Sequence, residues 1–146
     1  MKTGTSTVTA LIAASYIALA VPAVAAPPSD SHLPATHQLG EVTYLSGGIG
    51  QTESAAIKHV AKYYPLELEF LLKAKPMDKY LSDVTVRIKD VHQKMVLNVM
   101  SGGPFLLATM PAGKYTVSAE RNGRIEHREI QIAAHEHRRV VFEWQS

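Results

Sequence analysis

The sequence predicts a mainly β protein: a seven-stranded antiparallel β-sandwich preceded by one short amphipathic α-helix. From Leu66 onward, apolar and polar residues alternate with the period of two that is typical of half-buried strands. Turn residues recur roughly every 8–12 positions with no helical crossover between them, which favours a sandwich. Only residues 51–63 show the spacing of a helix.

The N-terminus has the three-part pattern of a cleavable signal peptide over residues 1–25. A lysine follows the initiating methionine, an apolar run extends from Val8 to Val21, and residues 23–25 (Ala-Val-Ala) are those a signal peptidase reads. The apolar run is about 14 residues, shorter than the ~20 of a bilayer-spanning helix. An uncleaved N-terminal anchor is the alternative. With cleavage after Ala25 we expect a soluble mature protein, periplasmic or secreted.

Between the signal and the sandwich the sequence predicts two segments. Residues 26–40 have three prolines and few apolar groups, which indicates an extended, disordered leader. Residues 41–65 are expected to hold a short strand at 41–45 and the helix over 51–63. Gly50 can cap the helix, and Pro65 ends it because the residue before a proline avoids the α region. The apolar face of this helix comprises Ile57, Val60, Ala61 and Tyr64.

Residues 66–146 are expected to form the β-sandwich domain. Asn122-Gly123 between two alternating runs is the strongest short hairpin signal in the chain. The apolar parity changes between Ile125 and Ile130, which indicates that this strand lies at an edge or contains a bulge. The seven predicted strands are 66–72, 84–89, 95–99, 105–109, 115–120, 125–132 and 139–144.

Composition excludes several classes of function. The chain has no cysteine, so disulfides, thiolate catalysis, iron–sulfur clusters, cysteine zinc sites and a lipoprotein anchor are all excluded. The formal net charge is only +2, which does not indicate a nucleic-acid binder. We expect no nucleic-acid partner and no cofactor.

The segment from Leu81 to Trp144 resembles the carboxypeptidase regulatory-like domain, a transthyretin-like (prealbumin-like) seven-stranded sandwich. The likeness is carried by residues 84–90 and by the run 110–117, which is similar to the family's apolar-Pro-x-Gly-x-Tyr-x-Val motif and continues into a hairpin. It departs from the family at residues 91–93, where a glycine is usual. The structural turn motif comprises Pro111, Gly113, Tyr115, Asn122 and Gly123.

The whole mature chain also resembles small exported proteobacterial proteins in which a Gly-Gly-Ile-Gly segment opens a helix before this domain. The resemblance implies a stabilising or binding module that accompanies peptidases or envelope proteins. It implies no catalytic residues.

Histidines offer the first candidate chemistry. His135 and His137 flank one residue in an expected hairpin loop, and His127 lies on the preceding strand. His-x-His on an extended chain places both imidazoles on one side, which suits Cu(II), Ni(II) or Zn(II), with Glu126 or Glu129 as a further ligand. A polar turn explains the same residues. A Cu(I) site would use methionines instead, although core filling accounts for them better; they are Met77, Met95, Met100 and Met110.

Two other patterns indicate anion binding. Residues 47–50 (Gly-Gly-Ile-Gly) before a helix can form a backbone nest for an anion, but a tight strand-to-helix connection is the favoured interpretation. Basic residues on the last strands suit anionic lipid head groups or glycans. Interspersed glutamates make a mixed-charge, solvated face the preferred alternative. The basic residues are Lys114, Arg121, Arg124, Arg128, Arg138 and Arg139.

Catalysis has little support in the sequence. Glu67 and Glu69 share one strand face, which we expect to be exposed to solvent, and no nucleophile elbow or His-Glu-x-x-His motif occurs. The sequence therefore predicts a non-catalytic binding or interaction module of the cell envelope, with an envelope protein or glycan as partner. The strand 125–132 is the expected site of pairing with a partner strand. A periplasmic metal-binding protein and an envelope hydrolase using Glu67 and His135 are the alternatives.

Overall fold

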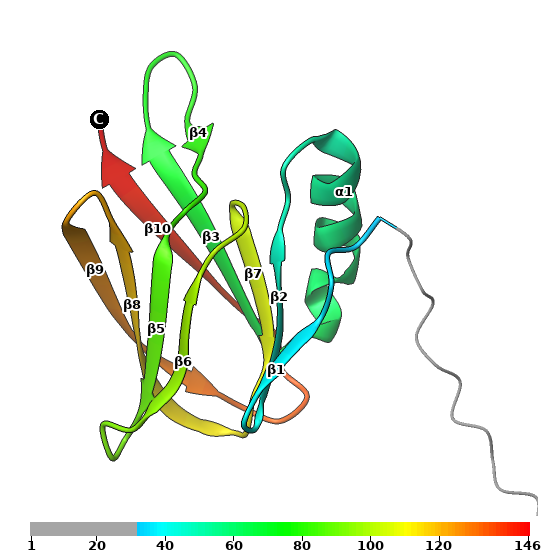
Figure 1. The fold of residues 1–146 in the computed structure, drawn as a ribbon, viewed down its shortest axis with the longest axis vertical. Helices are drawn as coiled ribbons and strands as arrows, with labels where there is room; N and C mark the ends of the chain where they lie inside the picture. Colours follow the sequence, from blue (N-terminus) through cyan, green and yellow to red (C-terminus); the bar gives the residue numbers. More distant parts are fainter. Residues whose placement is uncertain (1–31) are drawn as a thin grey trace, which may run out of the picture.

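The computed structural model describes residues 32–146, which form a mainly β protein with two facing sheets and one 13-residue helical segment (Figure 1). The signal-peptide prediction for residues 1–25 lies outside the described residues, as does the first part of the leader. Within the described residues no helix is long and apolar enough to cross a membrane.

The larger sheet has six strands. Its pairs are antiparallel except for β3 and β10, which run parallel over the whole of β3. β4 pairs with the last part of β3. The strands are, in spatial order, β1 (His37–Leu39), β2 (Val42–Gly47), β7 (Phe105–Thr109), β3 (Leu66–Lys73) with β4 (Lys79–Tyr80), and β10 (Arg138–Gln145).

The smaller sheet has four antiparallel strands. Asn122 and Gly123 connect two of them with φ angles of 51° and 76°. Positive φ at both positions is the signature of a type I′ turn, so the hairpin expected from Asn-Gly is confirmed. The strands are, in spatial order, β6 (Met95–Met100), β5 (Thr85–Asp90), β8 (Gly113–Arg121) and β9 (Arg124–Ile132).

The main core fills the space between the two sheets. Leu66, Leu68 and Phe70 of β3 are fully buried there, as the alternating pattern predicts. The ring of Phe70 lies 6.1 Å from that of Phe142 on the parallel neighbour β10. Burial of such side chains from water is the main force that holds two sheets together.

All seven predicted strands are present, but the sandwich is larger and less regular than expected. β2 confirms the short strand expected at residues 41–45, and it joins the larger sheet together with β1 and β4, which were not expected. β1 lies within the segment expected to be a disordered leader. The expectation of a purely antiparallel sheet is wrong for β3 and β10. Arg138 N donates to Pro65 O (2.8 Å), so both strands start side by side and run in the same direction.

The helical segment packs on the outer face of the larger sheet, beside β2 (Figure 1). It consists of α1 (Gln51–Val60) followed by the 3-10 turn η1 (Ala61–Tyr63). Ile57 and Ala61 are buried against side chains of β2 and β7, which makes a second small core. Tyr64 has an extended backbone, and the helix ends before Pro65 as predicted.

The turn between β5 and β6 is held by Asp90. Its carboxylate accepts hydrogen bonds from His92 N (2.8 Å) and Lys94 N (3.0 Å). Gln93 has a φ of 63° in this turn. A non-glycine residue therefore occupies a left-handed conformation, which L-residues rarely adopt.

Candidate functional site

The structure places the three predicted histidine ligands in different surroundings. His127 on β9 bonds Ser118 Oγ through Nδ1 (2.8 Å). His135 lies exposed in the loop after β9. His137 contacts the carbonyl of Tyr64 and the carboxylate of Glu67. Among residues 32–146 no group of three or more His, Asp or Glu side chains could hold a metal ion, so these histidines are not gathered into a site.

The methionines are not gathered into one core cluster either. Met110 is buried between the sheets, which agrees with core filling. Met77, Met95 and Met100 are exposed on the surface. Core filling therefore explains one of the four.

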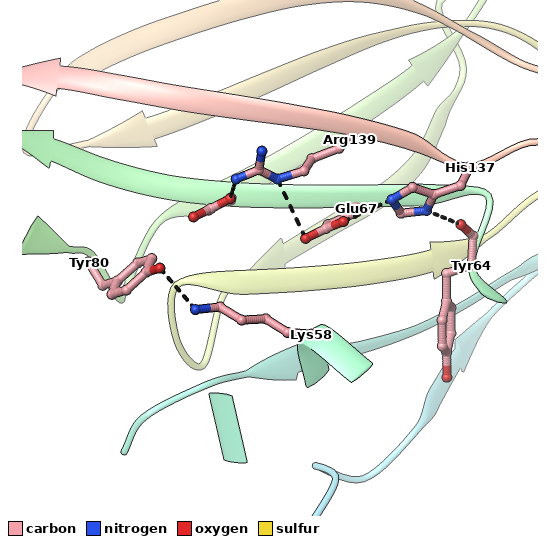
Figure 2. A network of polar contacts seen from close by, with 7 residues as sticks. Lys58, Tyr64, Glu67, Tyr80, His137 and Arg139 are labelled. Atoms are coloured by element: carbon pink, nitrogen blue, oxygen red, sulfur yellow. Dashed lines mark hydrogen bonds and ion pairs between the residues drawn. The ribbon is translucent and has the colours of Figure 1, made fainter. Parts of the chain in front are cut away.

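The most unusual polar feature is a pair of buried acids on β3, Glu69 and Glu67, the second of which is labelled in Figure 2. Their side chains are only 8% and 5% exposed. The prediction that they share one strand face is confirmed by the alternation with buried leucines, but the prediction that this face is open to solvent is wrong. The face belongs to a central strand of the six-stranded sheet and is covered by side chains from neighbouring elements.

Arg139 and His137 contact these two acids. The guanidinium of Arg139 bonds Glu69 Oε2, and its Nε lies 3.8 Å from Glu67 Oε1. The hydrogen bond with Glu69 raises the pKa of Arg139 above its ordinary value. Because β10 pairs parallel with β3, Arg139 lies directly opposite Glu67 in the register.

His137 connects the same acid to the end of the helical segment. Its Nδ1 lies 2.8 Å from the carbonyl oxygen of Tyr64, and its Nε2 lies 2.9 Å from Glu67 Oε2. A carbonyl only accepts hydrogen bonds, so Nδ1 carries a proton. Within the described residues no buried side-chain nitrogen or oxygen lacks a partner. The arrangement is therefore a network that connects β3, β10 and the end of the helical segment.

The sequence pattern did not reveal this network. The sequence predicts Glu67 and Glu69 as a same-face pair, but the His137 and Arg139 side chains that bond them lie 70 positions further along the chain. The predicted helix is the signal that could have indicated the burial of Glu67 and Glu69, because an amphipathic helix must pack its apolar face against a neighbouring element.

The glycine-rich connection before α1 contains its own anion. Gly48 N donates to the Glu53 carboxylate (2.6 Å), which fills the position a bound anion would take. A Cβ added at Gly47 would meet Glu53, and one added at Gly103 would meet the backbone of Gly47. These contacts favour the tight connection over the anion nest.

Within the predicted turn motif, a side-chain hydrogen bond links β8 to the preceding loop. Tyr115 OH donates to Pro111 O (2.7 Å), and Gly113 begins β8 between them. Burial, followed by the charges of Asp90 and Glu41, raises the pKa of Tyr115 above its ordinary value.

Two edges of the sandwich, β1 and β6, border a groove of about 550 Å³. The groove is lined by Leu39 from the end of β1, by Met95 and Leu97 from β6, and by Tyr115. β6 contains no charged residue, and within the described residues no side chain bonds its backbone. This strand therefore presents an unprotected edge.

The expected edge strand β9 is confirmed as an edge of the smaller sheet, and its pairing with β8 shows no bulge. Two backbone carbonyls of β9 accept hydrogen bonds from side chains, unlike those of β6. Arg128 donates to His127 O (2.8 Å), and Trp144 Nε1 donates to Arg124 O (3.4 Å). β9 also contains four charged residues, which discourage pairing with another strand.

The predicted basic residues are partly engaged within the molecule. Arg139 is paired with the two buried acids, and Arg128 lies over the ring of Phe142 with its Cζ 5.3 Å from the ring centre. Arg124 donates to Gln145 O (3.0 Å). These contacts remove three of the six residues from a free basic surface.

Comparison with protein-family models, with curated proteins and with solved structures finds no match to this chain.

Proposed function

We propose that the mature chain acts outside the cytoplasm, in the periplasm or after secretion, as a non-catalytic binding or interaction module of the cell envelope. The signal pattern of residues 1–25 supports the compartment. The two-sheet sandwich is compatible with the transthyretin-like type that residues 81–144 resemble. Satisfaction of the buried acids by Arg139 and His137 supports a structural role for the groups that an enzyme would otherwise use.

The observation that carries the proposal is the open edge of β6. Ser101 N donates to Val84 O (2.8 Å), and hydrogen-bonded pairs alternate along an antiparallel ladder. The backbone N–H and C=O groups of Leu97 and Val99 therefore point toward β5. Those of Asn98 and Met100 point away from the sheet. An extended segment of a partner can pair with these groups.

The groove beside β6 supplies the selectivity that backbone pairing lacks. Every second side chain of an added strand points toward the space between the two sheets. There it meets Leu39, Met95 and Leu97. The partner segment is therefore extended, with apolar residues at alternate positions. Since β9 is charged and its carbonyls are partly occupied, the interaction is assigned to β6 in place of strand 125–132.

The test is affinity capture from an envelope extract with the processed protein and two matched variants as bait. Asn98→Pro removes one outward N–H from β6 without removing a bond to β5. Gln131→Pro makes the equivalent change on β9, where the Asn122-Gly123 turn places residue 131 in an outward position. We expect the wild-type chain and Gln131→Pro to retain the same proteins and Asn98→Pro to lose them. Asn98→Lys is the second β6 variant if the proline variant melts early.

Capture that is unchanged by both β6 variants would contradict the assignment of the edge. Loss of capture in Gln131→Pro alone would return the interaction to β9. Recovery of the chain from the cytosol with its first 25 residues intact would contradict the proposed compartment.

A further inference from the structure

We propose that the tip of the β8–β9 hairpin is a binding site for a phosphate group. Arg121 and Arg124 flank the Asn122-Gly123 turn and lie directly opposite each other in the β8–β9 ladder. Figure 1 shows this tip beside the end of β10, and Trp144 of β10 donates its indole N–H to Arg124 O (3.4 Å). The site does not use β6 or its groove, so it goes beyond the function proposed above and is tested separately.

The two arginines line a pocket of about 270 Å³ between the hairpin tip and the ends of β3 and β10. Its other walls are Leu72, Asn122, Trp144 and Gln145. Among the described residues, the charged side chains that line this pocket are therefore both cationic. Pockets for drug-sized ligands measure about 300–1,000 Å³. This pocket is smaller, which suits a small anionic group.

Strand alternation places both arginines on the inner side of the smaller sheet. Val117 and Ala119 of β8 are buried in the main core, and Arg121 is the next residue on the same face. Arg124 shares that face because it lies opposite Arg121. Like charges directly opposite each other in a ladder repel and destabilise the pair. A dianion bound by both guanidiniums turns this repulsion into two attractions, so the pairing indicates an anionic ligand.

The acids of the hairpin do not neutralise the two arginines. On the inner face of β9, Glu126 contacts Arg128 (3.5 Å). Glu120 alternates to the outer face of β8 and is bound to Arg87 (2.7 Å). The inner face at this end of the hairpin therefore has three arginines and one glutamate, and that glutamate is already paired.

The facing sheet supplies no competing acid to the pocket wall. Glu143 alternates with the core residue Trp144, so it lies on the outer face of β10, where it contacts Lys73 (3.2 Å). Within residues 32–146 neither Asp83 nor the carboxylate of Ser146 forms an ion pair with either arginine. Both guanidiniums therefore lack an anionic partner in this part of the chain.

The chemistry of the two side chains favours phosphate over carboxylate. A guanidinium is a planar fork with five N–H donors, and Arg124 uses one of them on Gln145 O (3.0 Å). A carboxylate is filled by one fork, whereas a phosphate dianion has oxygens for two forks and matches their two charges. The phosphate belongs to a soluble monoester or to a lipid head group, and the experiment separates these sources.

Trp144 reports on the site because it lines the pocket and is the only tryptophan in the sequence. Its fluorescence is followed in the processed protein as inorganic phosphate or glycerol phosphate is added at constant ionic strength, at a pH where phosphate is a dianion, with chloride as the control anion. Phosphatidylcholine vesicles with and without phosphatidic acid form the second arm.

The test variants are Arg121→Gln and Arg124→Gln. The matched controls are Lys114→Gln and Arg138→Gln, which remove exposed cations of β8 and β10 that form no ion pair within the described residues. Arg121→Lys keeps the charge but removes the fork.

We expect saturable binding of phosphate by the wild type and both controls, and binding about tenfold or more weaker in each test variant. Arg121→Lys should lose about threefold or more, because one charge cannot replace the fork. Saturation by the soluble phosphates supports a monoester, and a response to phosphatidic acid vesicles alone supports a head group. No saturable response in either arm, an equal response to chloride, or equal losses in test and control variants would overturn the proposal.

Thermal unfolding adds a readout that a purely structural role would not produce. Without phosphate, Arg121→Gln should melt no lower than the wild type, because it removes the repulsion with Arg124. With phosphate, the melting temperature of the wild type should rise and that of the variant should stay unchanged, since only a bound ligand stabilises the folded state. A variant that melts lower without phosphate and gains as much from it as the wild type would show that Arg121 is only structural.

Discussion

At the scale of single residues, the main feature of the molecule is a pair of buried acids that are bonded to an arginine on the neighbouring strand. Glu67 and Glu69 are buried on a strand that otherwise contributes apolar side chains, and Arg139 lies across both. Removing one partner of such a group leaves an uncompensated charge, which costs more than the pair itself contributes.

Arg139→Leu is therefore expected to lower the free energy of unfolding by about 2 kcal/mol. That is less than the roughly 3–5 kcal/mol of a fully buried pair, because water reaches the outer side of the guanidinium. The matched control is Arg138→Leu, an exposed neighbour whose loss should change stability by less than about 0.5 kcal/mol. Urea unfolding measures both.

The double variant Arg139→Leu/Glu69→Leu isolates the coupling between the two residues. It should recover most of the lost stability, since an apolar pair replaces the charged one. If the double variant is as unstable as the two single changes added together, the two side chains are not coupled and our account of the network is wrong.

Tyr115→Phe is expected to lower stability by about 1 kcal/mol, because it removes the hydrogen bond to Pro111 O. Tyr63→Phe, at an exposed tyrosine, is the control and should have little effect.

The hydroxyl of Tyr115 also predicts a pH dependence. Burial raises its pKa in the folded protein above the ordinary value of about 10. The folded state therefore retains the proton where the unfolded state has lost it, and this contribution is complete below about pH 10 and is lost as the pH rises through the folded value. In Tyr115→Phe the alkaline loss of stability should be smaller, with Tyr64, whose pKa burial also raises, accounting for part of the remainder. Identical alkaline limbs in both proteins would contradict this.

At the scale of elements, local sequence signals predicted which strands and turns form, but they did not predict where the backbone of a turn is strained. Asn122-Gly123 predicted its hairpin because only those residue types accept the two positive φ angles. The turn at residues 91–93 has no such signal in the sequence. In the structure, Gln93 adopts the left-handed region, and the Asp90 carboxylate accepts hydrogen bonds from the amides of His92 and Lys94.

Gln93→Gly is expected to raise the free energy of unfolding by about 0.5 kcal/mol. Relief of the left-handed strain, about 1–2 kcal/mol for a non-glycine residue, outweighs the extra entropy that glycine gives the unfolded chain. Lys94→Gly next to it has no strain to relieve, because its φ is not positive, and should lower stability by about 0.5–1 kcal/mol. Thermal unfolding of both variants measures the difference. A lower stability for Gln93→Gly would show that the turn is unstrained.

At the scale of the whole molecule, the sequence predicted more of the fold than of the candidate site. The helix and all seven strands were predicted because each depends on residues close in the chain. The parallel pairing of β3 with β10 depends on residues about 70 positions apart, and no local pattern encodes it. The arrangement of the strands in space determines three further features for the same reason. These are the burial of Glu67, its contact with Arg139 and the edge position of β6.

The most direct test of the account is amide hydrogen exchange on the processed protein, alone and with the partner that it captures. In the free protein the amides of Asn98 and Met100 should exchange rapidly, whereas those of Leu97 and Val99 should be protected by pairing with β5. With the partner bound, protection of Asn98 and Met100 should rise about tenfold or more, with no change along β9. Protection that appears along β9, or at neither edge, would contradict the claim that this sandwich binds through β6.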